Sequence, residues 1–433
     1  MVKSMSSRYE QSTQFLSRAE ATIPIGSQTF SKSRTQYPVG ISPLFAAKAK
    51  GAYLWDLDGN RYIDLVSNLA SVTLGYRHRG VDSAVKKQMK LGNGFSLPGT
   101  LETVVAEKIK SLVPSAEMIR FGKNGTDATS AAIRLARAYT GRDYVAVCGY
   151  HGWQDWFIGS TSRNKGVPKK TSALTLTFKY NDIKSLEQLF IKTPKGIAAV
   201  ILEPMTNEFP MQKFLRDVKK LCQKNGAVLI FDETITGFRF SKGGAQEVFK
   251  VTPDLSTFGK GIANGYPLSV VCGSREIMRE MENIFFSGTF GGELLSLAAA
   301  NVVLGMHQRD EISPRLNEYG EELSQDLQKV INQTDMGGFL EIKGHPTWKF
   351  LEWKDGGEFT VPELKTFFMQ EMFRSGILIL STHNVTLAHN KKIREVALSK
   401  YERVLTLMKR AISEGSLKDK LEVIPLKPLF KVR

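Results

Sequence analysis

Short apolar runs alternate with helical patterns from about Met118 to Gly273, and no other feature of the sequence limits its possible folds as strongly. Regular alternation of this kind indicates βαβ units that build a mostly parallel sheet. Because the runs lack polar alternation, we expect strands that are buried on both faces. The predicted strands are residues 118–121, 144–148, 173–177, 197–202, 228–231, 255–258 and 269–272, and the predicted helices between them are residues 127–139, 183–190 and 212–225.

The flanking sequences have a different pattern. Residues 53–64 alternate around an Asp58-Gly59-Asn60 turn, which predicts a β-hairpin. Beyond Asn301, a helical stretch leads to strand-rich sequence at 337–353 and to helices near 361–374 and 391–412. We therefore expect an α/β protein with three parts: an N-terminal segment of a small domain (1–65), a large domain (66–305) and a C-terminal, α+β part of the small domain (306–433).

The chain is strongly basic, with a formal net charge of +16 over 433 residues. Its lysines and arginines are spread along the sequence, and no group of basic and aromatic residues forms a platform for nucleic acid. We therefore expect small anionic carbonyl or amine substrates, and no nucleic-acid partner.

Several features indicate the compartment. The polar N-terminal residues 1–20 have a helical pattern and no apolar signal core, and the apolar stretch 294–306 is too short to span a bilayer. The three cysteines, Cys148, Cys222 and Cys272, have no metal-binding or redox spacing. We expect a cytoplasmic protein with buried thiols, no metal site and no membrane contact.

A single lysine, Lys260, lies in a glycine-rich segment 28 positions after Asp232. Asp232 follows the apolar run 228–231, so its carboxylate should lie at the edge of the sheet where open α/β folds bind ligands. Glycines on both sides of Lys260 allow the backbone to approach a ligand closely. A buried lysine and a carboxylate that face one crevice indicate Schiff-base chemistry.

Residues 123–127 join a predicted strand to a predicted helix, with Gly125 and Thr126 at the turn. Free amides at a helix N-terminus, beside a glycine and a hydroxyl, form a phosphate site. A structural N-cap is the alternative, because Thr and Asp are favoured there for stability alone. The segment lacks the pattern of an ATP-type loop.

Other polar residues follow the same edge of the predicted sheet. Glu203 ends the strand 197–202, while Tyr150 and His151 follow the strand 144–148. By themselves, an acid here could cap the next turn and Tyr150 could be a core aromatic. Their occurrence together with Lys260 and an anion site favours a common site.

Six separated segments match one family in the right order, and they extend over nearly the whole chain. They are residues 51–64, 121–143, 150–152, 229–241, 253–267 and 288–300. Together they resemble class III pyridoxal-phosphate aminotransferases, and among these glutamate-1-semialdehyde aminomutases most closely. The resemblance implies fold type I, the aspartate-aminotransferase-like fold, with pyridoxal phosphate as cofactor and pyridoxamine phosphate in the half-reaction.

The resemblance also implies roles for individual residues. Lys260 would bind the cofactor covalently, and Asp232 would pair with the pyridinium nitrogen. Gly125 and Thr126 would hold the phosphate, and Tyr150 would stack on the ring. The other positions of the cofactor site are His151, Glu203, Asn207 and Thr289. Thr289 would reach the phosphate of a partner subunit, which implies a homodimer with shared active sites.

The chain departs from the aminomutase pattern where substrate would bind. Thr29 and Lys32 stand in place of a serine and an arginine, and Glu293 stands in place of an asparagine. Ser381 replaces an acidic gate residue, with His383 close by. We predict that Thr29, Lys32, Glu293 and His383 contact a substrate unlike glutamate. Residues 149–156 are similar to relatives from surface-polysaccharide and sugar biosynthesis.

The predicted function is transfer of an amino group from a donor amine to a carbonyl acceptor, such as an aldehyde, a keto sugar or a nucleotide-linked sugar. Lys260 would be the base that moves the proton. Two alternatives stay open: an aminomutase that moves the amino group within one molecule, and a non-catalytic relative that binds a partner or nucleic acid.

Overall fold

A computed structural model describes residues 7–355 and 357–426. Within them the chain forms two compact units: residues 7–69, 74–77 and 316–426 make the first, and residues 70–73 and 78–315 make the second. The first six residues of the predicted N-terminal helical segment lie outside the described ranges. No helix in these ranges combines the length and apolarity that are needed to cross a bilayer.

The second unit is built on a seven-stranded sheet in the order β4-β10-β9-β8-β7-β5-β6. Its strands are β4 (Met118–Gly122), β5 (Tyr144–Cys148), β6 (Thr175–Thr177), β7 (Ile197–Leu202), β8 (Val228–Asp232), β9 (Leu255–Phe258) and β10 (Ser269–Gly273). Strands β5 to β9 pair in parallel, whereas β10 runs antiparallel to both β4 and β9. The expectation of a mostly parallel sheet is confirmed.

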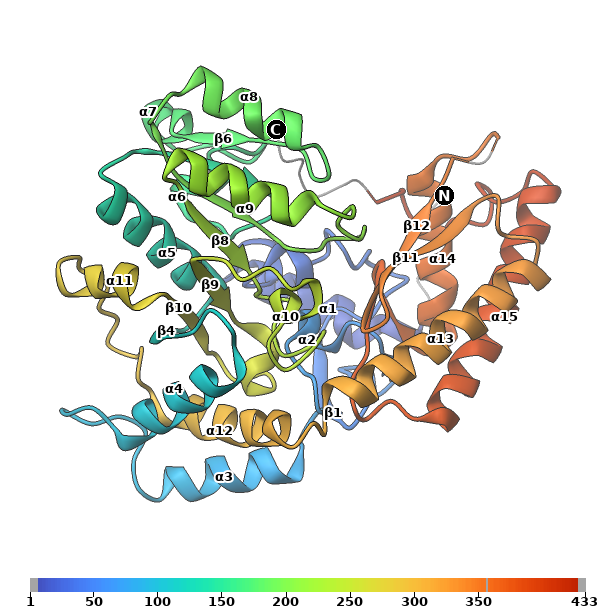
Figure 1. Cartoon of the computed structure of the whole chain (residues 1–433). Coiled ribbons are helices and arrows are strands. Elements are labelled where there is room, and N and C mark those ends of the chain that lie inside the picture. The colour runs from blue at the N-terminus through green and yellow to red at the C-terminus, as the bar shows by residue number, and fades with distance from the viewer. Residues whose placement is uncertain (1–6, 356, 427–433) are drawn as a thin grey trace. The chain divides into compact units, whose positions relative to one another are not determined.

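Alternate residues of the parallel strands face two separate apolar clusters. Val145 and Ala199 pack with α5 (Gly125–Thr140) and α11 (Arg275–Met278). Ala146 and Val200 pack with α8 (Ile183–Lys192) and α9 (Phe214–Asn225), which cover the opposite face (Figure 1). Because side chains alternate across a strand, a run that is apolar throughout can bury both faces.

The remaining helices of this unit lie at the edges of the sheet. α12 (Leu294–Gln308) packs on α3 (Arg79–Met89) and α4 (Thr100–Leu112). The short helices are α6 (Asp155–Ile158), α7 (Lys169–Ala173) and α10 (Ala245–Phe249), with 3₁₀ turns at Lys260–Ala263 and Arg279–Glu282. The predicted strand 173–177 is shorter than expected, because α7 extends to Ala173.

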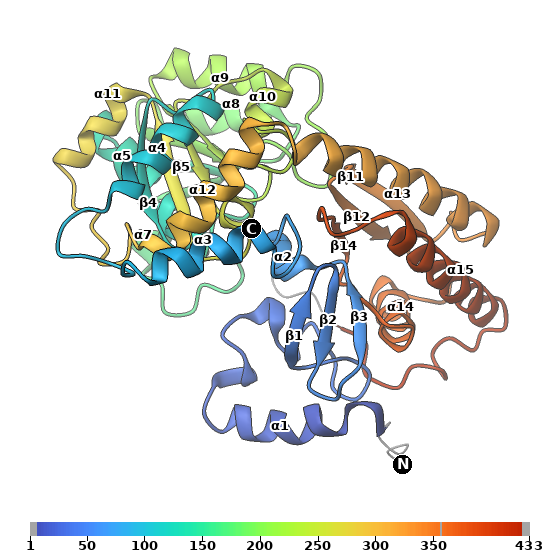
Figure 2. The same ribbon diagram turned by 90° about the horizontal axis from the view of Figure 1, so that it is seen from below.

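The first unit contains two small sheets (Figure 2). β1 (Ala46–Lys50), β2 (Tyr53–Asp56) and β3 (Arg61–Asp64) form a meander that β13 (Ile377–Leu378) extends in parallel, so the predicted hairpin is confirmed. β11 (Leu340–His345), β12 (Trp348–Trp353) and β14 (Thr382–Asn384) form the other sheet. The helices are α1 (Glu10–Glu20), α13 (Ser313–Gln333), α14 (Val361–Arg374) and α15 (Lys391–Ser413), with 3₁₀ turns at Ser7–Tyr9, Pro24–Gly26 and Phe30–Lys32.

The element α2 (Ser67–Ala70) is a single left-handed turn, which the sequence does not predict. Its four residues have φ values of 49°, 51°, 56° and 67°, and none of them is glycine. Each such residue costs about 1–2 kcal/mol. Asp64 Oδ1 accepts hydrogen bonds from the amides of Val66 (2.7 Å) and Ser67 (2.9 Å), and the Ser67 hydroxyl donates to Asn384 O (2.7 Å). These bonds help to hold a conformation that the residue types disfavour.

Candidate active site

Lys260 lies directly after β9 and Gly259, at the start of the 3₁₀ turn Lys260–Ala263. Its φ is +39°, a left-handed value that is uncommon outside glycine and that is often found at functional sites. Burial lowers the pKa of its amine below the usual value, against the opposing effect of the Glu203 and Asp232 carboxylates. An amine that loses its proton readily is a nucleophile toward carbonyl carbon.

Asp232, the last residue of β8, is a buried carboxylate surrounded by donors. Its Oδ1 accepts hydrogen bonds from the Thr234 amide (3.1 Å), the Thr234 hydroxyl (2.5 Å) and the Thr257 hydroxyl (3.0 Å). Its Oδ2 lies 2.9 Å from His151 Nδ1. Burial alone would raise the pKa of Asp232, but His151 and Thr234 hold it below the usual value. Asp232 is therefore a carboxylate at neutral pH, as the partner of a protonated ring nitrogen must be.

His151 supports this carboxylate from a fully buried position, with 1% of its surface exposed. Its Nε2 lies 3.1 Å from Cys148 O, while Nδ1 faces Asp232. Both partner atoms are acceptors, so the arrangement is satisfied when both ring nitrogens carry a proton. His151 thus supports Asp232 through a buried contact, a role that the sequence did not reveal.

Glu203 and Tyr150 meet beside the end of β7. Glu203 Oε2 accepts a hydrogen bond from the Tyr150 amide (3.1 Å). Burial, and then repulsion from Asp232, raise the pKa of Glu203. The Tyr150 ring is 47% exposed and packs edge-on against Phe157, with the ring centres 5.5 Å apart. A partly exposed ring that is fixed on one side can stack on a flat ligand. Asn207 lies in the loop beyond, where its Oδ1 accepts from Thr206 (3.3 Å).

The first turn of α5 has the features of a phosphate site. The first amides of a helix, here including those of Gly125 and Thr126, have no partner within the helix. The Thr126 hydroxyl is buried and lacks a hydrogen-bond partner within the described ranges. A Cβ on Gly152, where φ is +109°, would lie 2.4 Å from that hydroxyl oxygen, so only glycine fits there. Asp127 caps the turn by accepting from the Asn124 amide (2.8 Å).

The lysine turn, the aspartate loop and the phosphate turn converge. A Cβ on Gly259 would lie 3.3 Å from Thr234 Cγ2 and 3.9 Å from Gly125 Cα. The donors and acceptors fit pyridoxal phosphate: Lys260 for its aldehyde, Asp232 for its ring nitrogen, and the Thr126 hydroxyl with the α5 amides for its phosphate.

Two predicted site residues of the second unit, Thr289 and Glu293, lie just before α12. Glu293 is the N-cap of α12, where it accepts from the Leu295 amide (2.6 Å) and the Ser296 hydroxyl (2.6 Å) and pairs with Lys123 Nζ (3.1 Å). Burial would raise the pKa of Glu293, but the hydrogen bonds from Ser296 and Lys123 hold it below the usual value. Thr289 is exposed in the loop before α12.

Three predicted substrate residues belong to the first unit. The Thr29 hydroxyl accepts from the Lys32 amide (3.2 Å), and Lys32 Nζ donates to Asn68 Oδ1 (2.6 Å). His383 is buried, and its Nε2 lies 2.6 Å from the Tyr401 hydroxyl. Burial lowers the pKa of His383 to about 3, so it is neutral at physiological pH.

Two further residues beside Lys260 carried no signal in the sequence. Arg239 is buried and donates from Nη2 to Ala70 O (3.0 Å), while Asn264 Oδ1 accepts from the Thr73 amide (2.9 Å). Residues 70–73 are thereby held against the lysine turn, where a Cβ on Gly261 would lie 2.6 Å from Thr73 Oγ1. Their partners are distant in sequence, so only the fold reveals them.

Known proteins with this architecture share the chemistry that the site indicates. The family model "Aminotransferase class-III" matches residues 36–395. The glutamate-1-semialdehyde 2,1-aminomutase of Syntrophobacter fumaroxidans is 39% identical over 303 residues, which cover 66% of this chain and 70% of that protein. The same enzyme of Alkaliphilus metalliredigens is 36% identical over 345 residues, which cover 75% of this chain and 78% of that protein.

Among solved structures, the fold is similar to FumI of Sphingopyxis sp. MTA144 in its PLP internal aldimine form. The TM-score is 0.86 at 27% identity, and the match covers 94% of this chain and 98% of that one. The chain therefore belongs to the class III aminotransferase family, and it is a pyridoxal-phosphate-dependent transaminase or aminomutase.

Proposed function

We propose that the chain transfers an amino group between two molecules, from a donor amine to an anionic carbonyl acceptor such as a keto sugar or a nucleotide-linked sugar. The observation that carries the proposal is the convergence of the Lys260 turn with the Asp232 carboxylate and the first turn of α5. Pyridoxal phosphate supplies the aldehyde that accepts the amine and a ring that withdraws electrons.

The chain's own groups hold the cofactor and move the proton. Lys260 Nζ would hold the aldehyde of the cofactor, and its amine would act as the base that moves a proton during the transfer. The Asp232 carboxylate, kept charged by His151, holds the ring nitrogen protonated. The Thr126 hydroxyl and the α5 amides bind the phosphate.

A pocket within the first unit supports an anionic, hydroxylated acceptor. Its volume is about 280 Å³, and its wall includes Lys32, Tyr37, Asn68 and Asp64. Burial raises the pKa of Asp64, and its Oδ2 accepts a hydrogen bond from the Tyr76 hydroxyl (2.6 Å). The ammonium of Lys32 suits an anionic group, and the tyrosine hydroxyl and the amide suit sugar hydroxyls. We expect Lys32→Gln to raise KM about tenfold for an anionic acceptor, which is about 1.4 kcal/mol, and to leave KM for a neutral aldehyde unchanged. An equal change for both acceptors would contradict this assignment.

We also infer a homodimer with shared active sites. Leu97 and Phe285 are 77% and 82% exposed, and Phe95 and Phe290 are exposed beside them. The Leu294 amide donates to Asn93 O (2.8 Å), which joins the two loops that carry these side chains. An apolar surface of this kind marks an interface, and Thr289 lies within it. The free, buried cysteines support a reducing, cytoplasmic compartment.

The amino-transfer chemistry is tested by absorbance. The purified protein should show a bound-cofactor band that shifts when a donor amine is added. Lys260→Ala should abolish the band and the exchange, whereas Lys192→Ala, on the outer helix α8, should keep both. A wild-type protein without any band after cofactor loading would favour the non-catalytic alternative.

The second candidate is an aminomutase, which the two curated relatives favour by name. It is tested with enzyme that carries pyridoxamine phosphate and is supplied with glutamate-1-semialdehyde but no amine donor. Repeated turnover to 5-aminolevulinate would establish intramolecular transfer and overturn transfer between molecules. Formation of a single equivalent, or none, would support the transaminase.

A further inference from the structure

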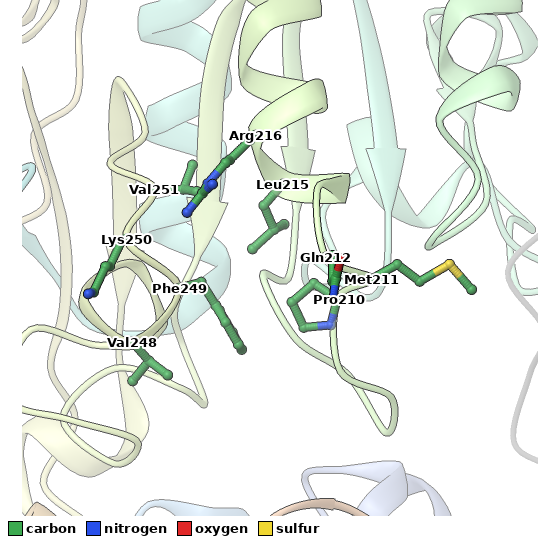
Figure 3. Close-up of a pocket in the computed structure, with 9 residues that line it drawn as sticks. All are labelled: Pro210, Met211, Gln212, Leu215, Arg216, Val248, Phe249, Lys250 and Val251. Atoms are coloured by element: carbon green, nitrogen blue, oxygen red, sulfur yellow. The ribbon is translucent and has the colours of Figure 1, made fainter.

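A cavity of about 310 Å³ opens on the second unit between the start of α9 and the end of α10 (Figure 3). Leu215 and Val251, which are buried, contribute apolar surface to it, and Pro210 and Phe249 extend that surface. None of its lining residues belongs to the Lys260 site. A recess with apolar walls can receive one apolar side chain or a small ligand.

The rim of this cavity carries apolar side chains that are open to solvent, beside the polar Gln212, Arg216 and Lys250. Met211, on one side, is 67% exposed, and Val248, on the other, is 39% exposed. Phe209 is exposed next to Met211, and its ring packs edge-on against Phe249 with the ring centres 6.5 Å apart. Exposed apolar side chains around a recess are typical of an interaction site.

A row of positive charge begins at the cavity and continues along α9. It consists of Lys213, Arg216, Lys220 and Lys224, which we call the basic stripe. Their spacing of three or four residues places them on one face of the helix, over about 16 Å. All four are exposed, and within the described ranges none forms an ion pair.

The charged side chains that line the cavity are both basic. Among the described residues these are Arg216 and Lys250, while the acids Glu208 and Glu247 stand beside the rim without lining it. Asp217 is the only acid of α9, and it is half-buried. A ligand that fills the cavity and follows the stripe must therefore combine an apolar group with several negative charges.

We propose that the cavity and the basic stripe bind an acidic peptide segment of a partner protein. One apolar side chain of the segment enters the cavity, and its carboxylates follow the stripe. An extended peptide covers the stripe with about five residues. A nucleic acid fits less well, because α9 offers no exposed aromatic rings for its bases and the Phe209 ring at the rim packs edge-on against Phe249. A bilayer surface would meet the rim but would not fill a recess.

The probe is a fluorescein-labelled synthetic peptide with one phenylalanine followed by alternating glutamate and serine, titrated with cofactor-loaded enzyme at physiological salt and read by anisotropy. Binding should weaken at least about tenfold when the phenylalanine is replaced by glycine, and by a similar factor with Met211→Ser/Val248→Ser in the enzyme. Arg216→Glu/Lys220→Glu should also weaken it at least about tenfold.

The matched control is Lys391→Glu/Lys392→Glu, which makes the same change in charge at the start of α15 in the first unit. This variant should bind the peptide as the wild type does, and all variants should keep the cofactor band and the amine exchange. Equal binding of the peptides with and without phenylalanine would show that charge attraction alone holds the peptide. That result would overturn the proposal. Tighter, stripe-dependent binding of single-stranded DNA or of phosphatidylglycerol vesicles would overturn it in favour of a nucleic acid or a membrane.

Discussion

Asp232 remains a carboxylate inside the second unit because amide, hydroxyl and imidazole donors surround it. Its pKa lies below the ordinary value of about 3.9. With the pKa lowered in the folded protein, this carboxylate stabilises the fold above the unfolded pKa, and that contribution is lost as the pH falls through the folded pKa. The same donors keep Asp232 charged throughout the neutral range, as its proposed role requires.

Replacing the imidazole tests this dependence. In His151→Leu, burial continues to act on Asp232 while its imidazole partner is gone, so we expect the pKa of Asp232 to rise. The rate of the donor half-reaction should then fall with decreasing pH in a range where the wild-type rate is flat. Stopped-flow absorbance across that range measures the shift, and His151→Gln should restore part of it because the amide can donate. Superimposable profiles for wild type and His151→Leu would contradict this role.

The Thr126 hydroxyl is a buried polar atom with no hydrogen-bond partner among the residues that the structure describes, which is unfavourable unless a ligand satisfies it. Thr126→Val keeps the shape and removes the hydroxyl. We expect the cofactor to dissociate about tenfold more readily, corresponding to about 1.4 kcal/mol for a lost hydrogen bond to a charged group. Unfolding of the cofactor-free protein should be unchanged or slightly harder. Loss of stability without cofactor, and unchanged cofactor affinity, would make Thr126 purely structural.

Elements differ in how well the sequence predicts them. The bounds of β5 and β7 match the predicted strands to the residue, because strands buried on both faces carry continuous apolar runs. The bounds of β9 match as well, although it contains Ser256 and Thr257. The strand 173–177 was placed two residues early, because a short apolar run does not separate the end of a helix from a strand. The turn α2 was missed, because four left-handed residues without glycine contradict local preference and depend on tertiary hydrogen bonds.

Some features of the candidate site could be predicted from the sequence, and others could not. Lys260 and Asp232 follow adjacent strands β9 and β8, so their position at one sheet edge could be predicted. The capping role of Glu293 and the burial of His383 could not be predicted. Glu293 pairs with Lys123, which is 170 positions away, and His383 contacts Tyr401 on another element. Contacts of this kind exist only after the chain has folded.

Lys195, in the turn between α8 and β7, tests how much a left-handed backbone conformation lowers the free energy of unfolding. It is exposed and has a φ of +53°. We expect Lys195→Gly to raise the free energy of unfolding by about 0.5–1 kcal/mol, because relief of the strain exceeds the added entropy of the unfolded chain. Lys192→Gly, in the last turn of the right-handed helix α8, should lower it by about 1 kcal/mol. Denaturant titration measures the free energy of unfolding of both variants. A loss of stability in both would show that the backbone at Lys195 is unstrained.

At the scale of the whole molecule, the inferred dimer gives Thr289 a function that one subunit alone does not. Thr289 is exposed and precedes the exposed Phe290 in the loop before α12. In a symmetric dimer, the same patch of each subunit forms the contact, so both Thr289 residues face the partner. Shared active sites then predict that two inactive variants can restore each other.

Under the proposed roles, Lys260→Ala should inactivate the site of its own subunit, and Thr289→Asp should inactivate the partner's site by repelling the phosphate bound there. Subunits unfolded together and refolded in equal amounts form hybrids in which one site has both intact residues. We expect about a quarter of the wild-type activity in this mixture, because half the dimers are hybrids and each carries one working site. A mixture of Lys260→Ala with Asp232→Ala should stay inactive, because both lesions belong to the subunit that holds the cofactor. Recovery in the second mixture, or none in the first although hybrids form, would place Thr289 outside the partner's site.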